Sequence, residues 1–97
     1  MGTPKLAMRH EPAANRFTVR LDDQIAYLSY EERGERVLEY THVYVPPEYR
    51  DRGIASLLTQ RALEYARTEG IAVIPSCSFV GYYLSQHPEY ESVVRRP

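Results

Sequence analysis

The sequence predicts an α+β fold in which an antiparallel meander joins one parallel β-α-β unit and helices pack on the sheet. Residues 16–21 alternate between apolar and polar side chains, as a half-buried strand does. Residues 54–69 carry apolar side chains at helical spacing, and residues 71–74 form a short apolar run typical of a buried parallel strand. A strand, a crossover helix and a second strand over roughly 30 residues predict a right-handed β-α-β unit.

The antiparallel part comes first in the chain. We expect residues 1–4 to be frayed and residues 11–15 to form a turn. Asp22-Asp23 and the segment Arg33-Gly34-Glu35 supply residues that favour turns. The strands expected between these turns are residues 5–10, 16–21, 24–31 and 36–45.

The helical part follows a proline stop. Pro46-Pro47 must end the strand, because proline cannot donate a hydrogen bond to a sheet. A helix is expected from Ile54 to about Glu69, and Gly70 is a typical residue to end it. Pro75 ends the next strand. A second helix should begin near Ser78 and break at His87-Pro88, before a short last helix that ends near Val94.

Length and composition limit the function classes. The 97 residues allow a single domain over residues 1–97, and the net charge of −1 gives no global field for nucleic acid or anionic membranes. No apolar run approaches the ~20 residues that span a bilayer. The first ten residues lack the apolar core of a secretory signal. One cysteine forms no intramolecular disulfide, which fits a reducing compartment. We therefore expect a cytoplasmic protein without nucleic-acid or membrane partners.

The junction between the third strand and the first long helix predicts an anion site. The helix leaves its first N–H groups without intrahelical partners, and they point toward the loop that ends at Gly53. Arg50 and Arg52 add positive charge, so a phosphate-bearing cofactor fits there. The pattern R-x-x-G-x-A alone is weak, and a tight turn with solvated arginines is the alternative. The motifs G-K-[S/T] and G-x-G-x-x-G are absent, which excludes a P-loop and a dinucleotide fingerprint.

The stretch Y-R-D-R-G-I-A-S-L-L resembles the acetyl-CoA-binding motif (Q/R-x-x-G-x-G/A) of the GNAT superfamily of N-acetyltransferases. Further segments are similar, in the same order, to the small stand-alone members of that superfamily. They are R-F-T-V-R-L, T-H-V-Y-V-P-P-E-Y-R-D-R-G-I-A-S-L-L, I-A-V-I-P-S-C-S-F-V and Y-L-S-Q-H-P-E-Y. The resemblance covers about residues 16–94 and implies a GNAT-like fold with splayed strands.

The resemblance also implies a binding site for acetyl-CoA or CoA. The amides of residues 52–55 would hold the pyrophosphate, and pantetheine would run in the gap between the strands ending at Val45 and Ile74. His42 and Cys77 match positions that are catalytic candidates in such proteins. The cofactor-binding residues implied are Val43, Val45, Arg50, Asp51, Arg52, Gly53, Ile54 and Ala55.

Both catalytic candidates have plainer interpretations. Cys77 precedes a helix N-terminus, which favours a thiolate, but a lone cysteine is commonly a small buried apolar residue. We place His42 on the same strand face as Leu38, Tyr40 and Tyr44, where a structural histidine is common. An imidazole can nevertheless accept a proton from an amine or a thiol near neutral pH. No histidine or cysteine cluster has the spacing of zinc ligands, so no metal is expected.

Two positions depart from the usual pattern of the family. Asp51 puts a carboxylate beside the expected phosphate site, and Val43-Tyr44 stands where a threonine and an acidic residue are more usual. The function expected from the resemblance is transfer of acetyl from acetyl-CoA to a primary amine of a small molecule or protein. Transfer is either direct, with His42 as base, or through an acetyl-cysteine at Cys77. The alternative is a non-catalytic acyl-CoA-binding or protein-interaction module.

Overall fold

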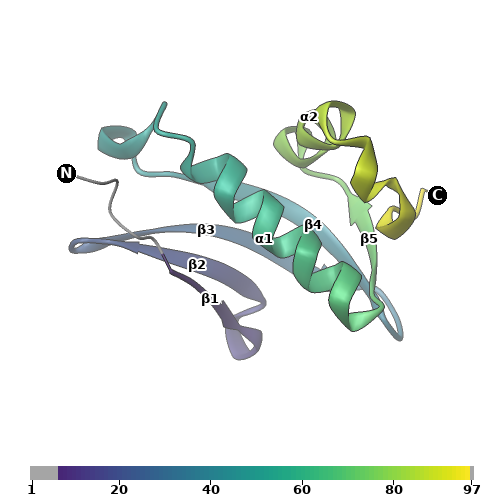
Figure 1. Ribbon diagram of the computed structural model, residues 1–97. Coiled ribbons are helices and arrows are strands. Elements are labelled where there is room, and N and C mark those ends of the chain that lie inside the picture. The colour runs from purple at the N-terminus through teal and green to yellow at the C-terminus, as the bar shows by residue number, and fades with distance from the viewer. Residues whose placement is uncertain (1–6, 97) are drawn as a thin grey trace.

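A computed structural model describes residues 7–96 of the chain (Figure 1). A five-stranded sheet carries two α-helices, and three short 3₁₀ segments complete the described part. The elements are β1 (Met8–Glu11), η1 (Pro12–Ala14), β2 (Arg16–Leu21), β3 (Gln24–Glu32), β4 (Val37–Tyr44), η2 (Pro47–Tyr49), α1 (Ile54–Glu69), β5 (Ala72–Pro75), α2 (Ser78–Gln86) and η3 (Pro88–Val93).

The strands lie in the sheet in sequence order, β1-β2-β3-β4-β5. The first three pairings are antiparallel and the last, between β4 and β5, is parallel. Helix α1 is the crossover between β4 and β5, and it lies along one face of the sheet (Figure 1). The predicted α+β architecture, a meander joined to a parallel β-α-β unit, is therefore confirmed.

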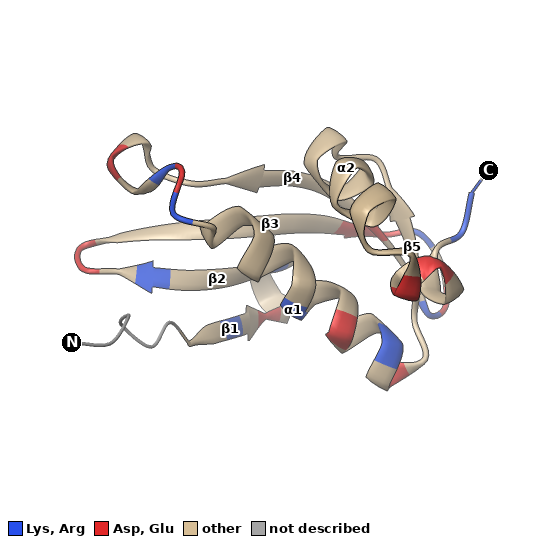
Figure 2. Ribbon diagram, turned by 45° about the horizontal axis from the view of Figure 1, so that its top comes forward, with Lys and Arg blue, Asp and Glu red and all other residues tan. Residues whose placement is uncertain are grey.

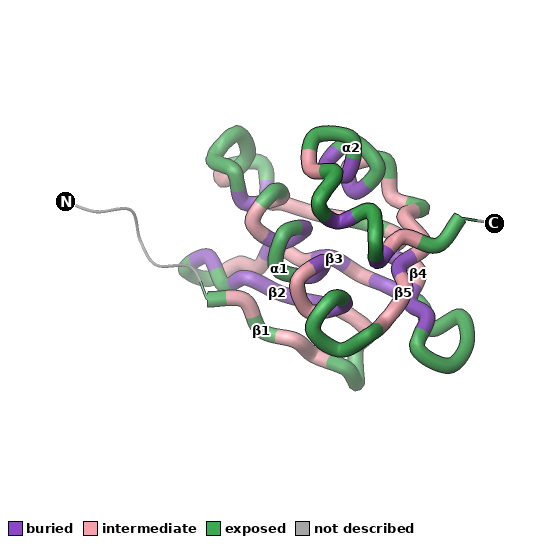
Figure 3. The backbone as a smooth tube through the Cα atoms, turned by 45° about the vertical axis from the view of Figure 1, so that its right-hand side comes forward, coloured by how far each residue is buried: buried purple, intermediate pink, exposed green. Residues whose placement is uncertain are grey.

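The core lies between α1 and the strands. On one face of β2 and β3 the alternate residues from Phe17 to Leu21 and from Ala26 to Tyr30 are buried, whereas the residues between them range from buried Thr18 to exposed Arg20; Figure 3 colours the backbone by this burial. Each fully buried aliphatic side chain stabilises the fold by about 1.5–3 kcal/mol relative to an exposed one. The fully buried residues that meet between sheet and helix include Phe17, Val19, Leu28, Leu58 and Leu63.

Most element boundaries agree with the sequence predictions, and α1 has the predicted limits. The first strand is a correction, because it runs over Met8–Glu11 rather than residues 5–10. Residues 12–14 form a 3₁₀ helix that ends at Asn15, which has a φ of 51°. Residues 1–6, which include the predicted frayed end, lie outside the described residues.

A β-bulge interrupts the pairing of β3 with β4. Ser29 pairs with His42 and the next residue, Tyr30, pairs with Tyr40, so Thr41 is the extra residue of the bulge. The Thr41 hydroxyl donates to the Ser29 carbonyl oxygen at 3.2 Å. Because a bulge adds one residue to a period of two, it reverses the faces of the residues that follow.

The pairing of β4 with β5 stops early. Its last pair is Tyr40 with Pro75, so the edge of β4 from Thr41 to Tyr44 has no β5 partner. The Cys77 N–H donates to the Tyr40 carbonyl oxygen at 2.9 Å, and the chain then turns into α2. This open edge of β4 borders the gap that the family resemblance implies between the strands ending at Val45 and Ile74.

Within residues 7–96, no helix combines the length and the apolar character that a membrane crossing requires.

Candidate functional site

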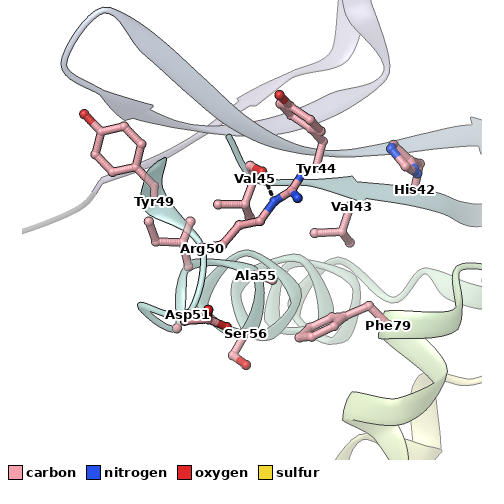
Figure 4. A pocket seen from close by; sticks show the side chains of 12 residues that line it. His42, Val43, Tyr44, Val45, Tyr49, Arg50, Asp51, Ala55, Ser56 and Phe79 are labelled. Carbon is pink, nitrogen blue, oxygen red and sulfur yellow. Dashed lines mark hydrogen bonds between the residues drawn. The ribbon is translucent and has the colours of Figure 1, made fainter. Parts of the chain in front are cut away.

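A cleft of about 480 Å³ lies where the open edge of β4 meets the N-terminus of α1. The loop between β4 and α1 closes one end, and α2 contributes the ring of Phe79 on the opposite side (Figure 4). The lining residues are His42, Val43, Tyr44, Val45, Tyr49, Arg50, Asp51, Gly53, Ile54, Ala55, Ser56 and Phe79. The structure thus brings together all of the predicted cofactor residues except Arg52.

The N-terminus of α1 opens into this cleft. Gly53 precedes the helix in the left-handed region, at φ 77°, and no side chain caps the first turn. The N–H groups of that turn are therefore free donors, and they carry the positive end of the helix dipole. A Cβ at Gly53 would meet no atom within 4 Å, so the space beside its backbone is open.

The charges around the helix start alternate in sign. Arg50, Asp51 and Arg52 follow one another in the loop before α1 (Figure 2). The Arg50 Nε donates to the Val45 carbonyl oxygen at 2.9 Å, across the end of the cleft (Figure 4). Asp51 is exposed and has a φ of 64°. Because its carboxylate is solvated, it opposes an anion in the cleft only weakly.

The loop before α1 is tied to the turn between β2 and β3. The Tyr49 hydroxyl donates to Asp22 Oδ2 at 2.7 Å, and the Gln24 amide donates to Glu48 Oε2 at 3.0 Å. The hydrogen bond to Asp22 raises the pKa of Tyr49 above its usual value. The guanidinium of Arg52 lies 5.6 Å from the centre of the Tyr49 ring.

The side chains of β4 divide between the two faces of the sheet at the cleft. Val43 and Val45 pack against the core on the α1 side, whereas His42 and Tyr44 point away from α1 (Figure 4). The Tyr27 ring lies 6.1 Å from that of His42 and 5.5 Å from that of Tyr44. The prediction that His42 shares a face with Leu38 and Tyr40 is wrong, because the bulge at Thr41 reverses the alternation.

Cys77 lies beside the cleft rather than in it. It is half-buried, packs against the hydrophobic core and precedes the first residue of α2. Among the described residues that line the cleft, His42 is present and Cys77 is not. The hydrogen bonds found for residues 7–96 do not join the two side chains.

Sequence reasoning missed four residues of the cleft, which are Tyr44, Tyr49, Ser56 and Phe79. Phe79, in the first turn of α2, is half-buried and lines the cleft. Its place one residue after the helix start could have indicated this, since the first turn projects toward the gap. Tyr49 lies in a loop and carried no signal in the sequence.

The part of the chain from residue 7 to residue 96 holds no cluster of three or more histidine, cysteine or acidic side chains placed to bind a metal ion. The polar side chains that line the cleft are the Arg50 guanidinium, the Asp51 carboxylate, the Ser56 hydroxyl, the His42 imidazole and the hydroxyl groups of Tyr44 and Tyr49.

Comparisons with known proteins give one consistent result. A sequence profile described as GCN5-related N-acetyl-transferase matches residues 16–93. Protein NATD1 of Gallus gallus is 33% identical over 85 residues, which are 86% of this chain and 77% of that protein. Protein NATD1 of Homo sapiens is also 33% identical over 85 residues, with 86% and 75% covered.

A solved structure shares the fold. The NMR solution structure of a GCN5-like protein from Staphylococcus aureus matches with a TM-score of 0.73 and 23% sequence identity. The match covers 95% of this chain and 90% of that one. At this level of identity the likeness concerns the fold alone.

Proposed function

We propose that this chain, which belongs to the GCN5-related N-acetyl-transferase family, transfers an acetyl group from acetyl-CoA to a primary amine. One observation carries the proposal. The uncapped N-terminus of α1 and the unpaired edge of β4 open into the same cleft. The first offers N–H donors to a diphosphate, and the second offers backbone hydrogen bonds to a chain of amides such as pantetheine.

The described residues fit such a donor. The diphosphate would accept hydrogen bonds from the first turn of α1, which begins at Ile54, with Arg52 near its charge. The pantetheine arm would lie along Val43 to Val45, against the ring of Phe79. The cleft volume of about 480 Å³ lies within the usual range for small-molecule sites, and the adenosine would extend beyond it.

The acceptor amine would approach from the sheet face that α1 does not cover. His42 is exposed on that face, at the open edge of β4. In direct transfer, the amine nitrogen attacks the thioester carbon while His42 accepts the proton that the nitrogen loses. A backbone N–H of β4 would stabilise the oxyanion. The C–S bond then breaks, and the departing thiolate takes up a proton to give CoA.

The alternative route uses Cys77 as a nucleophile. Its sulfur would attack the thioester carbon, release CoA and then pass the acetyl group to the amine. The arrangement of the cleft favours direct transfer, because His42 lines it and Cys77 does not. We therefore assign the proton transfer to His42 and no covalent role to Cys77.

Two variants separate the routes. His42→Gln should lower kcat about 10²-fold or more while leaving the affinity for acetyl-CoA unchanged, since loss of a general base typically has this size. Cys77→Ser should retain most of the activity. An acetyl adduct on Cys77, seen by intact-mass measurement when acetyl-CoA is added without acceptor, would instead support the covalent route.

The wild-type protein tests the function itself. Calorimetry should detect binding of acetyl-CoA and CoA, and release of free thiol should depend on an added amine. The acceptor panel should span a polyamine, an amino sugar, a peptide lysine and a peptide N-terminus. Binding of acetyl-CoA without transfer to any of these amines would favour a non-catalytic acyl-CoA-binding module, and absence of binding would refute the proposal.

A further inference from the structure

We propose that the turn between β2 and β3 supports the donor cleft from outside, through a brace made of Asp22, Tyr49 and Arg52. In this brace Asp22 holds Tyr49, and Tyr49 holds Arg52 and the loop that leads into α1. Asp22 is a positioning residue, because it acts on the ligand through Tyr49 and the loop. The identity of the ligand rests on the proposed function, whereas the brace rests on contacts within the protein.

Two hydrogen bonds join the same turn to the same loop. Tyr49 bonds to Asp22 across 27 residues of sequence, and Glu48 bonds to Gln24 across 24 residues. In each bond, one partner belongs to the connection between β2 and β3 and the other to the connection between β4 and α1. Two parallel links restrict both the position and the orientation of the loop, which one link alone would not do.

The loop needs such support, because its own hydrogen bonds are few and include one from the Arg50 side chain to the Val45 carbonyl oxygen. Its own backbone bonds are the two of a short 3₁₀ turn, from the Tyr49 N–H to Pro46 O at 2.9 Å and from the Arg50 N–H to Pro47 O at 3.3 Å. Asp51 adopts a left-handed conformation at φ 64°, which is unfavourable for most residues other than glycine. Such a conformation persists only where surrounding contacts impose it.

The brace reaches the cleft through the Tyr49 ring. One side of that ring lines the cleft and packs against the hydrophobic core, and the Arg52 guanidinium lies over it at 5.6 Å. A guanidinium over a tyrosine ring is attracted by the negative face of the ring. Release of Tyr49 from Asp22 would therefore free Arg52 together with the backbone that enters Gly53.

The decisive variant is Tyr49→Phe, which keeps the ring and removes the bond to Asp22. CoA affinity should fall about two- to fivefold, the size expected for loss of one solvent-exposed hydrogen bond to a carboxylate. Amide hydrogen exchange of residues 50–56 should become faster. Acetyl-pantetheine, which lacks the diphosphate, should bind both proteins equally. Asp22→Asn should lose less CoA affinity than Tyr49→Phe, because the amide oxygen still accepts the hydrogen bond.

Tyr90→Phe is the matched control. Tyr90 also donates to a carboxylate, Glu64 Oε2 at 2.6 Å, and lies under an arginine, Arg67 at 5.3 Å, but at the other end of α1. The Tyr90→Phe variant should leave CoA affinity and the amide hydrogen exchange of residues 50–56 unchanged.

The outcomes separate the brace from the proposed function. If wild type binds CoA and Tyr49→Phe binds it equally well, the brace is refuted. If wild type does not bind CoA, the proposed function fails, and exchange then decides the brace. Faster exchange confined to the loop in Tyr49→Phe supports it, and unchanged exchange refutes it.

Discussion

The two ends of α1 have similar neighbouring residues but differ in whether the protein satisfies their terminal backbone groups. Each end adjoins a glycine in the left-handed region, Gly53 and Gly70. Each also has a tyrosine whose hydroxyl donates to a carboxylate and whose ring lies beside an arginine. The C-terminal end is nevertheless closed by the protein itself, whereas the N-terminal end is open.

At the C-terminal end, the carbonyl groups of Ala66, Arg67 and Glu69 have partners. The Gly70 N–H and the Ile71 N–H both donate to the Ala66 carbonyl oxygen, the latter at 2.8 Å. The Arg36 guanidinium donates to the Glu69 carbonyl oxygen at 2.7 Å. At the N-terminal end no side chain caps the first turn. Satisfied ends stabilise the fold, so the unsatisfied end is the one that is available to a ligand.

The largest expected effect comes from placing a negative charge at the open end. Gly53→Asp should abolish acetyl-CoA binding in calorimetry, a loss of at least about 100-fold, because the carboxylate competes for the N–H donors that the diphosphate needs. Gly70→Asp is the control at the other end and should leave the affinity unchanged. Equal losses of affinity in the two variants would remove the distinction between the ends.

The next effect concerns the closed end. Tyr90 is only 3% exposed, and its hydroxyl bonds to Glu64. Tyr90→Phe should lower the free energy of unfolding by about 1–2 kcal/mol in urea denaturation. Tyr49→Phe should lower it less, since its bond to Asp22 lies at the surface. A reversed order of stability would show that the brace contributes more to folding than the closed end does.

Gly70→Ala should lower the free energy of unfolding by about 1 kcal/mol and leave the affinity for acetyl-CoA unchanged. The residue has a φ of 69°, which an alanine adopts only with strain. Thermal unfolding with and without acetyl-CoA measures both quantities. A changed ligand-induced shift in Tm would mean that the two ends of α1 are coupled.

Alkaline pH should weaken the closed end. Burial, followed by the hydrogen bond to Glu64, raises the pKa of Tyr90 to about 12, against an ordinary value of 10.0. The folded state therefore holds this proton more tightly, and the stability gained is complete below pH 10 and is lost as pH rises toward 12. Tyr90→Phe should show a shallower loss of stability over that window. If stability fell equally steeply with pH in the variant, the loss would not come from titration of Tyr90.

The smallest effect is expected in acid. Hydrogen bonds from Tyr90 and then Arg67 lower the pKa of Glu64 below its ordinary value of 4.5. Its contribution to stability is therefore present above pH 4.5 and is lost as the pH falls through the folded pKa. Glu64→Gln should flatten the acid limb of the stability profile. Since the carboxylate is solvated, the difference should be small, and a large one would indicate a wider rearrangement.

Local signals predicted the elements well. Gly53 and Gly70 bound α1 at the predicted residues, and Pro46-Pro47 ends β4 where expected. The location of the cleft also followed from sequence, because it depends on where a strand stops and a helix starts. These features are decided by residues that are neighbours in the chain.

Features that depend on distant residues were not predictable. The bulge at Thr41 arises from the fit of β4 against β3, and it moved His42 to the opposite face from the one predicted. The bond from Tyr49 to Asp22 joins two turns that meet only in the folded sheet. The residue pattern within either turn does not predict this contact between them.

The early end of β5 has a consequence for how this chain can vary. Since β5 ends at Pro75, the edge of β4 from Thr41 to Tyr44 leaves main-chain atoms without a β5 partner, and every amino acid carries such atoms. Under the proposed function, the side chains of residues 42 and 44 can therefore be substituted to suit a new amine, while the main-chain contacts that position the thioester stay the same. Donor and acceptor preferences can thus evolve separately on two sides of a single strand.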